Sequence, residues 1–464
     1  MPRERYGLNW PGKAECVKHL RQRPTAILKP CPEESADFDT TENLFIEGDN
    51  LEALKLLQKS HFGRIRMIYI DPPYNTGNDY IYSDDYSEPL NDYLKLTGQK
   101  GVRGRKFPAD IETAGRFHAG WLNMMFPRLR LARDLLRDDG VIFISIDDHE
   151  VTNLRCLCNE VFGEENFAAQ IIWQKVYSPR MDVRGFSTSH DYILCYVKKD
   201  IGAIGREVFK QNTKQFNFFD KEKQRYYRRR SIRKEGSNSL RTDAPNSFFS
   251  LRSPDDTEVY PVKPDGIEGC WRWSLATYFK NVNEGNVEWV KTDDGWQVYA
   301  KQYINETATK PPETLWLHGE VNHNHGAAEE LKNLLGAKVF DSPKPRELIM
   351  KAIGIATGSD KDAVILDFFA GSCTTAHAVM QFNADDGGNR KFIMVQLPEP
   401  CNEKSEAFKS GYKTVADIGK ERIRRAANNL KSKIPDPGFR VLKLDETHSA
   451  VDRSFIEVRH KSVQ

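Results

Sequence analysis

Short apolar runs rich in isoleucine and valine recur along the chain, and stretches with helical spacing separate them. Four runs stand out, at residues 67–70, 141–146, 364–366 and 392–395. Runs of this length, bounded by turn residues, predict buried strands, and their alternation with helices predicts an α/β fold with a mainly parallel sheet. Ligands of open α/β sheets bind beyond the carboxyl ends of the strands, so chemistry is expected directly after these runs.

The helical patterns are clearest at residues 50–58 and 117–137. The second carries apolar residues at helix-like spacing from Trp121 to Leu136. Pro127 is expected to kink or interrupt that helix, and Asp138-Asp139-Gly140 to stop it.

The middle of the chain has a different pattern, which predicts the domain organisation. From Tyr177 to about Phe340 the sequence is rich in aromatic, basic and turn residues with weak periodicity, which indicates a separate or inserted module. The α/β pattern resumes at Ser342, and Asp436-Pro437-Gly438 marks a turn into a short tail. The expected divisions are 1–176, 177–340, 341–435 and 436–464.

Composition narrows the class of protein. The 464 residues leave room for two or three domains, and a net charge of +2 means that an anionic partner must be met by a local basic patch. No apolar run reaches the roughly 18 residues of a membrane span, and residues 1–10 lack the apolar core of a signal peptide, so a cytoplasmic protein without membrane association is expected.

The eight cysteines form no CxxC pair, and His323-Asn324-His325 lacks spaced partners, so no metal site is expected.

The first candidate motif is Asp71-Pro72-Pro73-Tyr74, directly after an apolar strand. Two consecutive prolines fix the backbone and keep the Pro72 carbonyl out of a helix ladder. A carboxylate and a carbonyl could accept both hydrogens of a planar amine while the phenol ring stacks on its face. The alternative is a turn that only ends the strand.

The second candidate motif, residues 367–375, reads Asp-Phe-Phe-Ala-Gly-Ser-Cys-Thr-Thr and again follows a strand. Its small residues allow close approach of a ligand, and a helix that opens at Thr374 would direct its first amides at an anion. Alone, such a turn is most often an ordinary connection. Its occurrence with the first motif in one chain favours a ligand site.

Together, Asp-Pro-Pro-Tyr and the Phe-x-Gly-x-x-Thr loop resemble the S-adenosylmethionine-dependent DNA amino-methyltransferases. The catalytic motif precedes the cofactor loop, which is the order of the β group, whose target-recognition region lies between the two. Segments 43–54, 74–77, 141–148, 344–349 and 417–423 are similar to modification subunits of Type III restriction systems. The resemblance implies a Rossmann-like methyltransferase fold, with residues 177–340 as an inserted recognition module. The chain is shorter than expected for such a subunit, which leaves an orphan or compact relative open.

The resemblance also implies roles for individual residues. The catalytic residues would be Asp71, Pro72, Pro73 and Tyr74. The cofactor-binding residues would be Asp49, Asp71, Lys344, Asp367, Phe368, Phe369, Ala370, Gly371, Ser372, Thr374, Gln396 and Glu399. Within that set, the loop from Phe369 would hold the methionine part of S-adenosylmethionine, Lys344 would lie near its carboxylate, and Asp49 would meet the adenosine. Asp49 is equally expected as a helix N-cap.

Two positions depart from the family pattern. Cys373 stands where the family usually has glycine, and a positive φ there would cost a cysteine roughly 1 kcal/mol or more. After the strand at 392–395, where the family commonly places an acid that binds the ribose, Gln396 takes the nearest position and Glu399 follows three residues later. Both are candidates for the ribose ligand.

The resemblance implies double-stranded DNA as substrate, with the target base flipped into a pocket and stacked on Tyr74. Aspartate rather than serine at the start of the motif is typical of N6-adenine enzymes. Basic residues near aromatic ones form the candidate DNA-binding groups, although a charge run is often only a solvated face. These are Arg103, Arg105 and Lys106, and Arg225, Arg228, Arg229 and Arg230.

Several alternatives remain open at this point. They are an N4-cytosine enzyme, an RNA adenine methyltransferase, a methylase of protein glutamine, and a non-catalytic DNA-recognition subunit. Cytosine C5 methylation needs a cysteine nucleophile, and Pro400-Cys401 lacks the glutamine that follows it in that family. The resemblance also implies a homodimer, with a restriction subunit as a possible further partner.

Overall fold

The computed structural model describes residues 7–76, 109–179, 181–208, 213–305 and 308–445, and the chain divides into two compact units. The larger unit comprises Met1–Glu207 and Pro311–Gln464, and the smaller comprises Val208–Lys310. Arg103, Arg105 and Lys106 lie outside the described residues.

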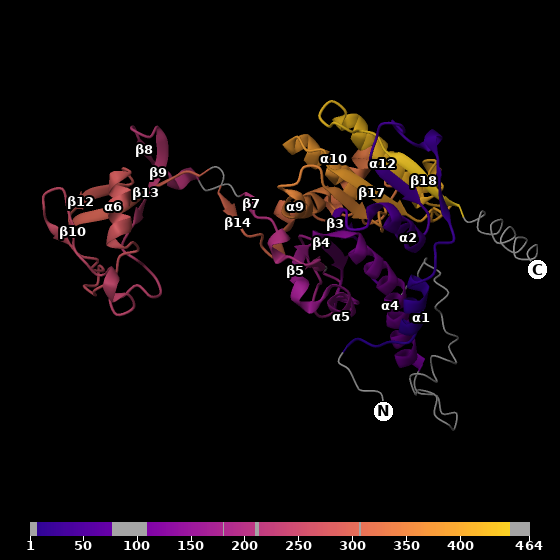
Figure 1. Cartoon of the computed structure of the whole chain (residues 1–464), viewed down its shortest axis with the longest axis horizontal. Helices are drawn as coiled ribbons and strands as arrows, with labels where there is room; N and C mark the ends of the chain where they lie inside the picture. The colour runs from indigo at the N-terminus through magenta and orange to yellow at the C-terminus, as the bar shows by residue number, and fades with distance from the viewer. Residues whose placement is uncertain (1–6, 77–108, 180, 209–212, 306–307, 446–464) are drawn as a thin grey trace, which may run out of the picture. The chain divides into compact units, whose positions relative to one another are not determined.

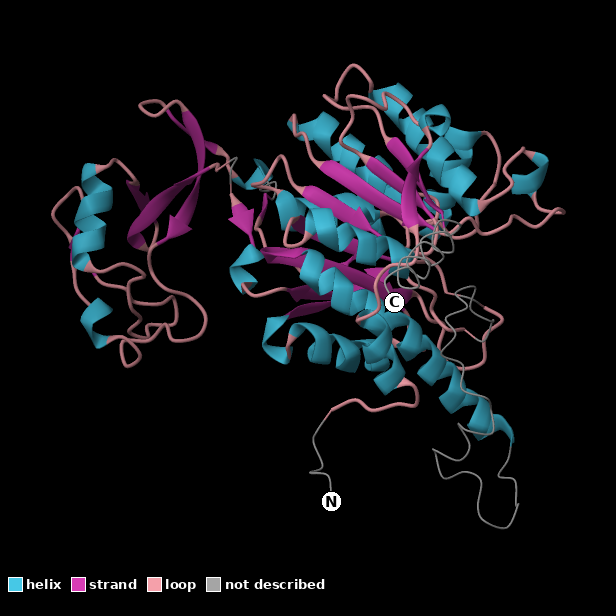
Figure 2. Cartoon of the chain, turned by 45° about the vertical axis from the view of Figure 1, so that its right-hand side comes forward, coloured by secondary structure: helices cyan, strands magenta, loops and turns pink. Residues whose placement is uncertain are grey.

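The larger unit is built on one ten-stranded sheet with the order β1-β18-β2-β17-β16-β3-β4-β6-β5-β15. Neighbouring strands from β18 to β4 all run parallel, whereas β6 is antiparallel to both β4 and β5. Helices cover both faces of this sheet (Figure 2). Its strands are β1 (Ile27–Pro30), β2 (Leu44–Glu47), β3 (Ile65–Ile70), β4 (Leu136–Ile146), β5 (Phe167–Gln174), β6 (His190–Val197), β15 (Leu315–Trp316), β16 (Val364–Asp367), β17 (Lys391–Gln396) and β18 (Arg440–Asp445).

The helices of this unit pack through three apolar clusters, two of which include strands of the sheet. They are α1 (Lys13–Leu20), α2 (Asn50–His61), α4 (Ala109–Leu135), α5 (Val151–Phe162), α7 (His318–Val321), α8 (Asn324–Leu335), α9 (Arg346–Thr357), α10 (Thr374–Asp386), α11 (Glu406–Lys409) and α12 (Val415–Leu430) (Figure 1). Every residue of β3 is buried, and successive side chains alternate between the clusters. Ile68 and Ile70 join α2, α4 and α5, whereas Met67 and Tyr69 join α9, α10 and α12. This double coverage explains why β3 reads as a continuous apolar run.

All four predicted strands are present, but several predicted boundaries differ from those of the structure. Pro127 does not interrupt α4, which continues to Leu135, and Asp138-Asp139-Gly140 lies inside the segment of β4 rather than ending a helix. Residues 440–445, expected in a tail, form β18 because their backbone pairs with β2 and β1. The smaller unit is also narrower than the expected module 177–340, since β6 and α8 belong to the larger unit.

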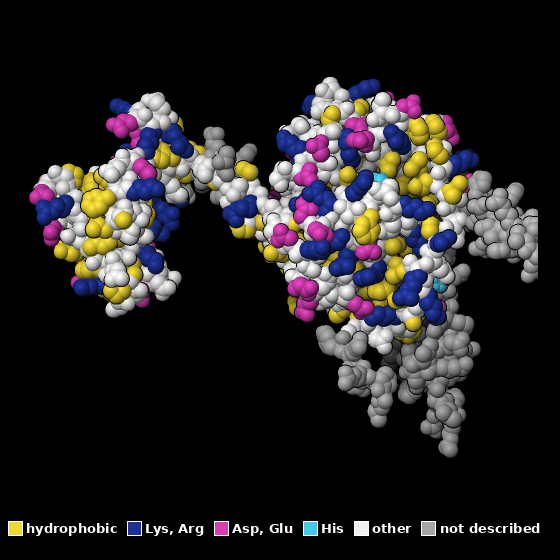
Figure 3. Space-filling model, viewed as in Figure 1, with side chains coloured by type: hydrophobic (Ala, Val, Ile, Leu, Met, Phe, Trp, Pro, Cys, Tyr) yellow, Lys and Arg dark blue, Asp and Glu magenta, His cyan; other side chains and the backbone are white. Residues whose placement is uncertain are grey.

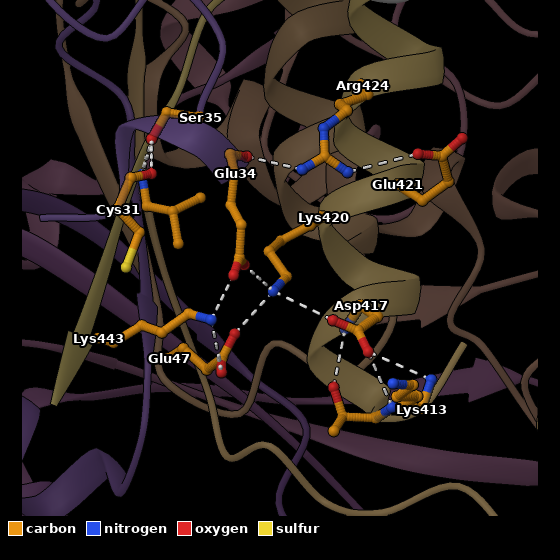
Figure 4. A network of polar contacts seen from close by, with 12 residues as sticks. Cys31, Glu34, Ser35, Glu47, Lys413, Asp417, Lys420, Glu421, Arg424 and Lys443 are labelled. Atoms are coloured by element: carbon orange, nitrogen blue, oxygen red, sulfur yellow. Dashed lines mark hydrogen bonds and ion pairs between the residues drawn. The ribbon is translucent and has the colours of Figure 1, made fainter. Parts of the chain in front are cut away.

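A network of ion pairs fastens α12 to the strands at the far end of the sheet (Figure 4). Lys420 is nearly buried, and its ammonium lies 2.7 Å from Glu47 Oε2 on β2 and 3.2 Å from Asp417 Oδ1. It also pairs with Glu34, to which Lys443 of β18 binds as well. Because these contacts join segments from both ends of the chain, they fix the position of α12 behind the sheet.

The smaller unit has its own antiparallel sheet, with the order β12-β13-β9-β8 and a core around Ile232, Trp271 and Tyr278. The chain enters through β7 (Glu207–Val208) and leaves through β14 (Thr309–Lys310), which pair with each other. Its other elements are β8 (Phe218–Asp220), β9 (Arg225–Ser231), β10 (Leu251–Arg252), β11 (Glu258–Val259), α6 (Leu275–Asn283), β12 (Val287–Thr292) and β13 (Gly295–Tyr303).

Charged side chains of both signs are mixed over the visible face of the larger unit, in keeping with the small net charge (Figure 3). In the part of the chain that the structure covers, no helix is long and apolar enough to cross a lipid bilayer.

Candidate functional site

The sheet order brings the predicted site segments to one edge. Strands β2, β17, β16 and β3 are consecutive parallel neighbours, so their carboxyl ends lie side by side. Asp49, Gln396, the loop after Asp367, and Asp71 therefore follow one another along that edge. A pocket at its centre is lined by Tyr69, Asp71, Phe340, Ser342, Pro343, Lys344, Ile349, Asp367, Phe369, Ala370, Gly371, Ser372, Thr374 and Thr375.

Asp71 and Lys344, far apart in sequence, form the ion pair of this pocket. Lys344 Nζ donates to Asp71 Oδ2 at 2.6 Å and also lies 5.1 Å from the centre of the Tyr74 ring. Asp71 Oδ1 and the Tyr74 hydroxyl are buried, and among the described residues neither finds a hydrogen bond of standard geometry. Burial first, and then the charge of Asp71, raises the pKa of Tyr74 well above its usual value, so the phenol is neutral. The Lys344 ammonium thus holds one oxygen of Asp71, and the other oxygen can accept a hydrogen bond from a ligand.

The turn that carries this motif is braced by residues that the sequence patterns did not single out. Trp121 Nε1 of α4 donates to the Pro73 carbonyl at 2.7 Å. Asn75, at a left-handed φ of 60°, donates to the buried carboxylate of Glu150, which also contacts His118 Nδ1 at 2.5 Å. No local signal marks Trp121 or Glu150, because each reaches the turn from a distant segment.

The second motif forms the other side of the pocket. The buried Asp367 carboxylate accepts from the Phe369 amide at 3.1 Å and from the Thr375 hydroxyl at 2.6 Å, which closes the loop on itself. Burial raises the pKa of Asp367 to about 7. The pocket is also lined by Ala370, whereas the side chain of Phe368 is fully buried in the core.

Helix α10 opens at Thr374, as predicted, and its N-cap is Cys373. Cys373 adopts φ 60° and ψ 41°, so the position where the family usually has glycine does require the left-handed conformation. No side chain caps this helix. Its first backbone amides can therefore donate to an acceptor other than a capping side chain. Gly371 also has a positive φ, of 51°.

The remaining predicted cofactor residues have structural partners of their own. Asp49 is the N-cap of α2, where it accepts from the Leu51 and Glu52 amides, and it also pairs with Arg128 at 3.2 Å. The Gln396 side chain accepts from the Gly371 amide at 2.6 Å and so supports the loop. Burial raises the pKa of Glu399. The residues that line the central pocket do not include Asp49, Gln396 or Glu399.

The predicted basic group of the smaller unit lies on β9, where its members differ in environment. Arg229 makes two hydrogen bonds to Glu288, at 3.0 and 2.6 Å, which raise the pKa of the guanidinium. Arg228 donates to Gln302, and Arg225 to the Ile304 carbonyl. Arg225 and Arg230 are exposed to solvent, whereas Arg229 is half-buried and its charge is paired with that of Glu288.

Comparison with known proteins decides the family. A family model described as DNA methylase matches residues 65–406, which include both motifs. The chain belongs to the DNA methylase family.

Curated relatives agree with this assignment. The methylase is 33% identical to the Type III restriction-modification enzyme EcoPI Mod subunit of Escherichia phage P1, over 99% of this chain and 74% of the relative. It is 34% identical to the StyLTI Mod subunit of Salmonella typhimurium, over 94% of this chain and 65% of that subunit. It is also 33% identical to the Type II methyltransferase M.KpnI of Klebsiella pneumoniae, over 88% and 92% of the two chains. The chain is thus an enzyme that methylates DNA, and the non-catalytic interpretation is set aside.

Proposed function

We propose that this methylase transfers a methyl group from S-adenosylmethionine to the N6 amine of an adenine flipped out of a short DNA sequence. The amine loses one proton, and S-adenosylhomocysteine is the leaving group. The observation that carries this proposal is the Asp71 carboxylate, whose Oδ2 is held by Lys344 while its buried Oδ1 makes no hydrogen bond of standard geometry within the described residues. Leaving a buried acceptor unpaired costs about 1–3 kcal/mol, and the amine of a substrate base would remove that cost.

The residues of the pocket fit the cofactor. The uncapped amides at the start of α10 favour a carboxylate, and Gly371 at positive φ lets the backbone approach a ligand. S-adenosylmethionine supplies the electrophilic methyl group. Phe369, Gly371, Ser372 and Thr374 would hold its methionine part, and Asp49 with Gln396 or Glu399 would face its nucleoside along the same edge.

The chemistry of this chain's residues is mainly positioning. An exocyclic amine is a weak nucleophile because its lone pair is delocalised into the ring. Hydrogen bonds to Asp71 Oδ1 and the Pro72 carbonyl would favour a pyramidal nitrogen with a localised lone pair, while the Tyr74 ring stacks on the base. Trp121 and Glu150 keep the turn in place, so little reorganisation is needed at the moment of transfer.

The proposed assembly follows the Type III relatives. The smaller unit, Val208–Lys310, would read the DNA sequence, with the exposed Arg225 and Arg230 meeting phosphates. A homodimer that also recruits a restriction subunit is the proposed form in the cell.

The experiment is single-molecule sequencing of genomic DNA from a methylase-free host that expresses this chain, wild type or Asp71→Ala. N6-methyladenine in one short motif, with wild type only, would support the proposal. N4-methylcytosine would replace the assigned base, and methylation of RNA alone would replace the substrate. Binding of S-adenosylhomocysteine by purified Asp71→Ala, measured by calorimetry, is the control that the pocket is folded.

A further inference from the structure

A buried arginine lies behind the loop proposed to bind the cofactor. Arg422, on α12, is fully buried, and its Nη1 donates to the Ser372 hydroxyl at 3.1 Å and to the Thr374 hydroxyl at 2.6 Å. These two hydroxyls flank Cys373, the N-cap of α10. One guanidinium nitrogen therefore joins both sides of the left-handed turn.

The charge of Arg422 is only partly neutralised. Its Nη2 lies 3.7 Å from Glu330 Oε2, and neither atom completes a hydrogen bond of standard geometry. Arg346 shares the same carboxylate, with its Nε 3.2 Å from Glu330 Oε1. Arg346 also pairs with a second carboxylate, because its Nη2 donates to Glu347 Oε1 at 3.2 Å. Arg422 is therefore the guanidinium that places its charge directly behind the start of α10.

His377 does not offset that charge. Its ring nitrogens lie 3.5 Å from Arg422 Nε and 3.3 Å from Arg346 Nη1. Burial first, and then the two arginines, lowers the pKa of His377 well below its usual value, so the ring is neutral and accepts at one nitrogen only. His377 therefore adds no charge to the cluster, in which the guanidinium groups of Arg422 and Arg346 face the carboxylates of Glu330 and Glu347.

The cluster also connects the two sides of the pocket. Arg346 is the first residue of α9, two positions after Lys344, which holds Asp71. The ion pairs of Lys420 fix α12 from its other side (Figure 4). The position of Arg422 relative to the loop is therefore also fixed.

We propose that Arg422 is a positioning residue for the cofactor: it holds the Ser372–Thr374 turn and adds positive charge behind the amides that receive the carboxylate of S-adenosylmethionine. This inference rests on the proposed function and deepens it. A positive charge close to an uncapped helix N-terminus strengthens anion binding, and the effect is greatest for groups that contact the turn itself. The adenosine part, farther along the edge, should be much less affected.

The test compares two ligands by calorimetry. S-adenosylhomocysteine carries the amino-acid carboxylate, whereas 5′-methylthioadenosine lacks the whole amino-acid part. Arg422→Met is expected to weaken S-adenosylhomocysteine about tenfold or more, as the loss of charge-assisted hydrogen bonds predicts. The affinity for 5′-methylthioadenosine should change less than about threefold, which also shows that the variant is folded.

The chain offers a matched control in Arg390. This arginine is equally buried and donates to Thr357 and Asp386, away from the loop. Arg390→Met should lower the stability of the fold and leave the ratio of the two affinities unchanged. Loss of both ligands to the same degree in Arg422→Met, or no loss of either, would overturn the assignment.

A second variant keeps the inference testable if Arg422→Met does not fold. Thr374→Val keeps the shape of the side chain but removes the hydroxyl that Arg422 contacts at 2.6 Å. It should selectively weaken S-adenosylhomocysteine, and unchanged selectivity would refute the role of the turn. Failure of wild type to bind S-adenosylhomocysteine would instead contradict the proposed function.

Discussion

The contact between Cys373 and Gly419 makes a quantitative prediction. Cys373 holds a left-handed backbone, which costs a non-glycine residue about 1 kcal/mol or more. Gly419 lies inside α12, where glycine costs about 1 kcal/mol relative to alanine. A Cβ added to Gly419 would lie 2.7 Å from Cys373 Sγ, so the glycine makes room for the buried thiol.

The perturbation is Gly419→Ala, made in wild type and in Cys373→Gly. In wild type the helix gains about 1 kcal/mol, but forcing a methyl against a buried sulfur costs about 1–3 kcal/mol. We expect a net loss of up to about 2 kcal/mol. Without the sulfur, the nearest remaining atoms are the Gly371 oxygen at 3.3 Å, which must shift by a few tenths of an ångström, and a Phe45 carbon at 3.5 Å, which is in ordinary contact. The same substitution should then stabilise the protein by up to about 1 kcal/mol.

The assay is urea unfolding of all four proteins, followed by circular dichroism. The difference between the two effects of Gly419→Ala is the coupling energy, expected at about 1–3 kcal/mol. Cys373→Gly alone should be nearly neutral, since relief of about 1 kcal/mol of backbone strain offsets a similar loss of buried side chain. Equal effects of Gly419→Ala in both backgrounds would refute the reasoning.

Three further predictions concern the pocket and the smaller unit. Burial raises the pKa of Asp367 to about 7, so the folded state binds more protons than the unfolded state, and stability should fall as pH rises from about 4 to about 7. Asp367→Asn should flatten that dependence, and an unchanged slope of the unfolding free energy against pH would contradict it. Tyr74→Ala should slow methyl transfer by about tenfold or more through loss of base stacking, at constant affinity for S-adenosylhomocysteine, and an unchanged single-turnover rate would remove Tyr74 from the pocket. Arg230→Ala should lower the slope of log DNA affinity against log salt by about one. Arg229→Ala should mainly destabilise the smaller unit, because Glu288 loses two hydrogen bonds and keeps the one from the Tyr227 hydroxyl; equal slopes for both variants would contradict the distinction drawn from the structure.

The core strands and the two site motifs of this protein could be predicted from its sequence alone, because both depend on local chemistry. The four apolar runs predicted the strands, because a strand covered on both faces must be apolar at every position. Asp71-Pro72-Pro73-Tyr74 and the Gly371 loop were likewise recognisable, since fixed or left-handed backbone conformations need particular residues. Cys373 departs from that rule, and only the structure shows that its backbone is left-handed.

Tertiary structure alone decided which of these groups meet. Lys344 reaches Asp71, Arg422 reaches Ser372 and Thr374, and Glu150 reaches Asn75, only because the order of strands in the sheet brings distant segments to one edge. Patterns of a few residues carry no information about that order. Tertiary contacts also account for two of the boundaries that differ from the prediction. Residues 440–445 form a strand because they pair with β2, and α4 continues through Pro127, where packing outweighs the local preference.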